Sequence, residues 1–60
     1  MLYRVQHNYR ISQPRIIHKI LGERNEGALI EADSEEHLLE ILRSKYNLNP
    51  FYLKYQTEAP

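Results

Sequence analysis

One segment of this chain carries the full pattern of a short amphipathic α-helix, and it limits the possible folds more than any other feature. Its apolar side chains recur at helical spacing: Leu38, Leu39, Ile41, Leu42 and Tyr46. Asp33 or Ser34 is expected to cap the first turn, since Asp33 precedes Glu36 by the three residues of a capping box. Asn47 suits the left-handed exit from a helix, and Pro50 forbids continuation. A single helix of this length needs other elements to cover its apolar side.

The other clear periodicity has a repeat of two residues, which is typical of half-buried strands. It predicts strands over residues 2–11, 27–32 and 51–56. The side chains expected to face inward are Tyr3, Val5, His7, Tyr9 and Ile11 on the first strand, Ala28, Ile30 and Ala32 on the next, and Phe51, Leu53 and Tyr55 on the last.

Residues 15–21 fit two interpretations. Ile16, Ile17, Ile20 and Leu21 would share one face of a helix that ends at Gly22. Three isoleucines favour a strand instead, and an isolated helix of little more than two turns is weak. We therefore expect a strand over these residues.

Together these elements predict a single α+β domain over residues 1–60. It is a small two-layer fold with a mostly antiparallel sheet of three to four strands and one helix packed on one face. The predicted order is βββαβ, with βαβαβ as the alternative. The third strand, the helix and the last strand would form a right-handed crossover. The second face of the sheet would have no helix to cover it.

The register of the first predicted hairpin decides which side chains that open face carries. The register that best separates polar from apolar side chains pairs Tyr9 with Ile16 and His7 with His18. A second register, which pairs Ile11 with Arg15, separates them less well. In the preferred register the open face carries Arg4, Gln6, Asn8, Arg10, Arg15, Ile17, Lys19 and Leu21.

The formal net charge is zero, but the charges are segregated along the chain. Residues 1–22 hold four basic and no acidic side chains, whereas residues 23–40 hold seven acidic ones and one arginine. A basic open face with Arg4, Arg10, Arg15 and Lys19 would suit nucleic-acid binding, because neutralised phosphates supply affinity. The aromatic side chains argue against it, since Tyr3 and Tyr9 are expected inside the core and cannot stack on bases.

Protein association is the function we prefer from the sequence. A 60-residue chain without cysteine has a marginal core, and it gains stability by covering apolar surface with a partner. We expect a small interaction module that associates with itself through the open face or an edge strand. The expected contact residues are Arg10, Arg15, Ile17, Lys19 and Leu21.

Other classes of function find little support in these residues. No phosphate loop, nucleophile elbow or His-Glu-x-x-His motif occurs, and a domain of this size is expected to lack room for a cleft of about 300 Å³. His7 and His18 would pair across two strands, but two ligands do not make a metal site. We expect no enzyme activity, cofactor or metal, no membrane span, and a cytoplasmic location, since the chain lacks a long apolar run, a leader-like start and cysteine.

Overall fold

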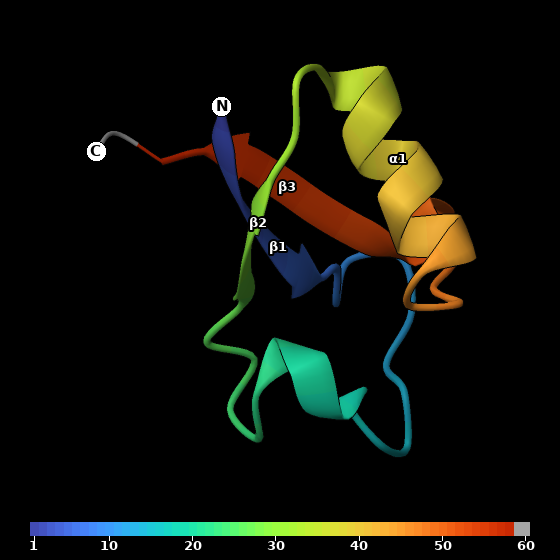
Figure 1. The fold of residues 1–60 in the computed structure, drawn as a ribbon. Coiled ribbons are helices and arrows are strands. Elements are labelled where there is room, and N and C mark those ends of the chain that lie inside the picture. The colour runs from blue at the N-terminus through green and yellow to red at the C-terminus, as the bar shows by residue number, and fades with distance from the viewer. Residues whose placement is uncertain (59–60) are drawn as a thin grey trace.

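Three strands form one antiparallel sheet, and one α-helix packs against it (Figure 1). The computed structural model describes residues 1–58. The elements in chain order are β1 (Leu2–His7), the 3-10 turn η1 (Lys19–Leu21), β2 (Ala28–Glu31), α1 (Glu35–Ser44), the 3-10 turn η2 (Pro50–Tyr52) and β3 (Leu53–Thr57). The predicted small α+β fold is confirmed, with three strands and one helix.

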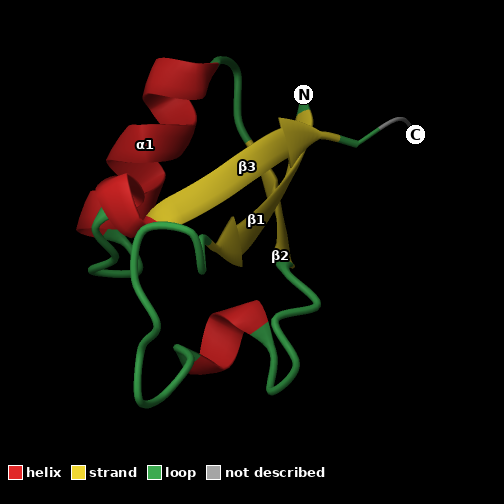
Figure 2. Cartoon of the chain, turned by 180° about the vertical axis from the view of Figure 1, so that it is seen from behind, coloured by secondary structure: helices red, strands yellow, loops and turns green. Residues whose placement is uncertain are grey.

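β1 is the central strand, and the sheet order is β2-β1-β3 (Figure 2). Val5 lies opposite Ala28 of β2 and Tyr55 of β3, and both pairings are antiparallel. The two outer strands therefore run parallel to each other. Parallel strands need a long connection, and α1 carries the chain from one edge of the sheet to the other.

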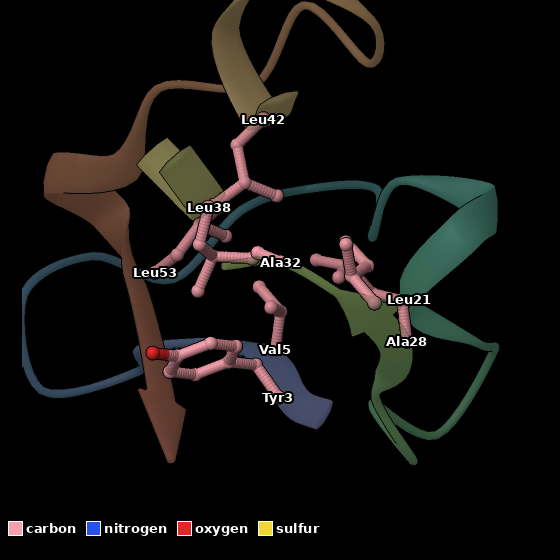
Figure 3. Close-up of a cluster of buried hydrophobic side chains, with 9 residues drawn as sticks. Tyr3, Val5, Leu21, Ala28, Ala32, Leu38, Leu42 and Leu53 are labelled. Atoms are coloured by element: carbon pink, nitrogen blue, oxygen red, sulfur yellow. The ribbon is translucent and has the colours of Figure 1, made fainter. Parts of the chain in front are cut away.

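The alternation expected along β1 is confirmed for its first six residues. Tyr3, Val5 and His7 are buried on the side of the sheet that faces α1, and Arg4 and Gln6 lie on the open side. The core cluster is Tyr3, Val5, Leu21, Ala28, Ile30, Ala32, Leu38, Leu42 and Leu53. Figure 3 shows Leu38 and Leu42 of α1 reaching toward Val5, with Leu21 next to Ala28. The layer above the sheet thus consists of α1 and of the short turn η1.

Both ends of the helix lie where the sequence predicts them, and the structure decides which of the two candidate residues caps its start. Ser34 is the N-cap, since its hydroxyl accepts the backbone N–H of His37, and Asp33 lies one residue outside. His37 completes the cap because its Nδ1 accepts the backbone N–H of Asp33 at 3.0 Å. Asn47 takes the expected left-handed conformation with φ 54°, and the N–H of Leu48 donates to the carbonyl of Leu42.

The predicted strand over residues 15–21 is wrong. Both edges of β1 are occupied by β2 and β3, so the sheet offers this segment no place beside β1. The segment instead forms an irregular connection beyond the end of β1 that leads into η1, where the ring of His18 accepts the backbone N–H of Ile20. The pairings of His7 with His18 and of Tyr9 with Ile16 therefore do not form.

The first and last strands are also shorter at one end than predicted. β1 stops at His7 because Asn8 begins a turn: its side chain accepts the backbone N–H of Arg10, and its carbonyl accepts that of Ile11. Tyr9 and Ile11, expected in the core, are exposed. β3 starts at Leu53, since residues 50–52 form η2, and Phe51 is exposed as well.

Candidate functional site

An apolar groove of about 410 Å³ lies at the end of the sheet where β1 stops and β3 starts. One wall is the connection after β1, and the other wall is the segment between α1 and β3. The groove is lined by His7, Ser12, Gln13, Pro14, Ile16, His18, Leu21, Leu48, Asn49, Tyr52 and Leu53. This volume exceeds the limit expected for so short a chain, so that expectation is wrong. The long connection supplies the extra wall.

Exposed apolar side chains lie on both segments that wall this groove. Seven large apolar residues are exposed, and five of them lie on segments 9–16 and 51–52. These five, which we call the apolar rim, are Tyr9, Ile11, Ile16, Phe51 and Tyr52. The exposed fraction of Ile16 reaches 85%. The two segments are held together at their base, where the N–H of Asn8 donates to the carbonyl of Tyr52 at 2.8 Å.

The polar groups of the groove are tied to nearby backbone. The buried ring of His7 places Nε2 3.0 Å from the Ser12 carbonyl and 3.3 Å from its hydroxyl. A carbonyl only accepts, so Nε2 carries the ring proton and donates it to Ser12. A protonated Nε2 cannot remove a proton from the hydroxyl, so this pair lacks the nucleophile and base arrangement of hydrolases. The side chain of Asn49 accepts the N–H of Phe51.

The charge around the groove has one sign. The lining contains no carboxylate, and neither do residues 8–21 and 45–52, which build the two walls. These stretches hold four cationic side chains: Arg10, Arg15, Lys19 and Lys45. The acidic side chains lie elsewhere, largely between residues 23 and 40.

The structure does not gather the predicted contact residues on one sheet face. Arg10, Arg15, Ile17 and Lys19 lie on the connection between β1 and β2, outside the sheet. Leu21 is the clearest correction, since it is only 2% exposed and belongs to the core. Ile17 is partly buried against the same core.

Arg4 is separated from the other three cations expected to bind nucleic acid. It lies on the open face of β1, where its guanidinium pairs with Glu58 at 2.8 Å and donates to the carbonyl of Glu26 at 3.0 Å. The basic sheet face predicted from the hairpin register is therefore absent from the described residues. Residues 8–21 carry the other three cations on one wall of the groove instead.

His7 and His18 line the same groove, although no strand pairing joins them. Within residues 1–58, no group of three or more His, Cys, Asp or Glu side chains is placed to share a metal ion. The described part of the chain also has no helix with the length and apolar character needed to cross a bilayer.

Comparisons with protein-family models, curated proteins and solved structures find no match to this chain. The function proposed for the site therefore rests on its geometry. Sequence reasoning missed Ile16 and Phe51, because it assigned both to strands. The available signals were Asn8 and the Asn49-Pro50 pair, which are turn residues that end the regular pattern on both sides of the groove.

Proposed function

We propose that this chain is a non-catalytic protein-interaction module whose contact surface is the groove with its apolar rim. The observation that carries the proposal is that five exposed apolar side chains lie on the two segments that wall one groove, and that two of them, Ile16 and Tyr52, line it. Exposed patches of this kind, bordered by polar residues, mark binding sites for other proteins. Tyrosine and arginine, which recur as interface anchors, both occur on its walls.

The non-catalytic part of the proposal rests on the ring of His7, which donates to the Ser12 carbonyl and is not free to act as a base. The proposal includes no cofactor. It keeps the cytoplasmic location expected for a chain without cysteine.

A selection from a library of displayed random peptides tests the proposal on the whole chain. We expect peptides that bind the native protein and lose binding to Ile16→Asp, because a carboxylate at this exposed position repels an apolar ligand without disturbing the core. Leu29→Asp is the matched control, since Leu29 is also exposed but lies on β2. Two outcomes contradict this surface: the selection enriches no peptide, or the enriched peptides bind the two variants equally.

Self-association through an edge strand remains a second part of the proposal. Met1 and Ala32 exchange hydrogen bonds between β1 and the end of β2, so alternation directs the N–H and carbonyl of Leu29 away from β1. The exposed side chain of Leu29 adds apolar surface at the same edge. Leu29→Pro removes only the outward donor. Sedimentation equilibrium is expected to show a dimer that this substitution dissociates, and a native monomer rules the edge contact out.

Single-stranded nucleic acid is the alternative ligand, and one observation favours it. Tyr9, Phe51 and Tyr52 are exposed, so the objection that the aromatic rings are buried holds for Tyr3 and not for Tyr9. Exposed rings next to cations are the usual platform for stacked bases. Amide NMR titration with a short oligothymidylate tests it. Salt-sensitive shifts at these three residues would favour nucleic acid over protein, and an unchanged spectrum would exclude it.

A further inference from the structure

We infer that the partner which occupies the groove is an acidic peptide segment with one bulky apolar anchor. The inference rests on the proposed function and names the chemistry of its partner. It follows from two features that coincide at this place: an apolar hollow and a cationic border without any carboxylate.

Two of the cations are chain neighbours of lining residues, although neither lines the groove itself. Arg15 lies between the lining residues Pro14 and Ile16, and Lys19 follows the lining residue His18. Among residues 1–58, Arg10, Arg15 and Lys19 form no ion pair. Three exposed cations on one wall produce a positive electrostatic potential, and this potential lowers the energy of a negatively charged ligand.

The hollow itself fits an apolar side chain. Leu21, Leu48 and Leu53 contribute aliphatic surface to the lining, and Ile16 and Tyr52 belong to both the lining and the rim. A volume of about 410 Å³ accommodates one aromatic or branched aliphatic side chain together with adjacent backbone. The apolar anchor of the peptide is buried in the hollow, and the carboxylates on either side of it interact with the cations of the wall.

A second copy of this chain is a poor occupant of the same groove. In a two-fold dimer with the groove on the axis, each groove would face its own equivalent, so the cations of both walls would oppose one another. A one-sided contact of the groove with the acidic residues 31–36 of another copy would be head-to-tail, and such contacts continue into open chains unless they close into a ring. A separate acidic segment meets neither problem.

The selection of displayed peptides also tests this inference, through the composition of what is enriched. We expect a pool with excess Asp and Glu around a conserved aromatic or aliphatic position. A pool that depends on Ile16 but is neutral or basic refutes the acidic partner and leaves the proposed function standing. An empty pool refutes both. The two failures are therefore distinguishable.

A direct measurement follows with the most enriched peptide and a copy in which Gln replaces every Glu and Asn every Asp. Fluorescence anisotropy is expected to show at least about tenfold weaker binding of the neutral copy at low salt, and a smaller difference at high salt. The double variant with Arg15→Gln and Lys19→Gln should weaken binding of the acidic peptide, whereas Arg24→Gln, outside both walls, should not. Equal affinity of both peptides contradicts the inference.

An oligothymidylate of similar charge separates the two anionic ligands. If it displaces the acidic peptide and binds more tightly, the groove belongs to a nucleic acid and the inference is refuted. If it fails to compete at equal concentration, the peptide's apolar anchor contributes to recognition as inferred.

Discussion

At the scale of single residues, the side chain of Asn25 pairs with the backbone of β1, and the sequence pattern does not predict this contact. Its side-chain oxygen accepts the N–H of His7 at 2.8 Å, and its side-chain nitrogen donates to the carbonyl of the same residue at 3.0 Å. Asn25 thereby replaces a backbone partner just beyond the last pair between β1 and β2, Val5 with Ala28. It is buried, with φ 58°, a conformation that asparagine tolerates better than most residues.

Replacing Asn25 with Ala should lower the free energy of unfolding by about 2–4 kcal/mol, because two buried backbone groups lose their partner and alanine disfavours this φ. Asn47→Ala is the matched control. Asn47 has φ 54° but is exposed, so its loss of about 1 kcal/mol measures the backbone term alone. Urea unfolding of both variants checks the difference. Equal losses would mean that the two hydrogen bonds contribute nothing.

At the scale of elements, α1 shows what local pattern predicts well. Its apolar spacing placed Leu38 and Leu42 in the core, where both are fully buried, and Asn47 marked its exit. The cap was less certain, since Asp33 and Ser34 are both good capping residues. The structure decides between them: the N–H of His37 donates to the Ser34 hydroxyl, and the ring of His37 accepts the N–H of Asp33, one residue before the cap.

The cap predicts unequal effects of two neighbouring substitutions. Ser34→Ala should cost about 1 kcal/mol, because the N–H of His37 loses its acceptor in the first turn. Asp33→Ala should cost less, since its side chain is exposed and lies outside the helix. Thermal unfolding followed by circular dichroism compares them. A larger loss of stability for Asp33→Ala would show that Asp33, and not Ser34, caps the helix.

The connection from β1 to β2 is the element that sequence could not predict. Its apolar residues occur as two adjacent pairs, Ile16 with Ile17 and Ile20 with Leu21, which suit neither a clean strand nor a long helix. A contact between distant parts of the chain decides the conformation of this connection, because β3 occupies the edge of β1 that a hairpin would need. The candidate groove depends on this connection, and for that reason its lining was not predicted.

Leu21 is expected to anchor that connection. Leu21→Ala should lower the free energy of unfolding by about 2–4 kcal/mol, since the side chain is 2% exposed within the core cluster. Ile16→Ala, at 85% exposure, should change it by less than about 0.5 kcal/mol. Chemical denaturation measures both. A neutral Leu21→Ala variant would mean that η1 does not pack on the sheet in solution.

At the scale of the whole molecule, a side-chain hydrogen bond joins the helix layer to the sheet in addition to apolar packing. The Tyr55 hydroxyl of β3 donates to Glu35 Oε1 at the start of α1, at 2.7 Å. This hydrogen bond raises the pKa of Tyr55 above its ordinary value, and burial and the charge of Glu35 add to the shift. The contact joins two residues that are 20 positions apart in the chain, and sequence periodicity does not predict such a pair.

The raised pKa makes this contact sensitive to alkaline pH. The folded protein keeps the Tyr55 proton at pH values where the unfolded chain has lost it, so the stabilisation is complete below about pH 10 and declines as pH rises through the folded pKa. The free energy of unfolding should therefore fall above about pH 10. Tyr55→Phe removes the titrating group, and Glu35→Gln removes the charged acceptor, so both should give a shallower decline than the native chain. Denaturation series across this pH range measure the slopes, and slopes that match the native protein would show that the two layers do not depend on this contact.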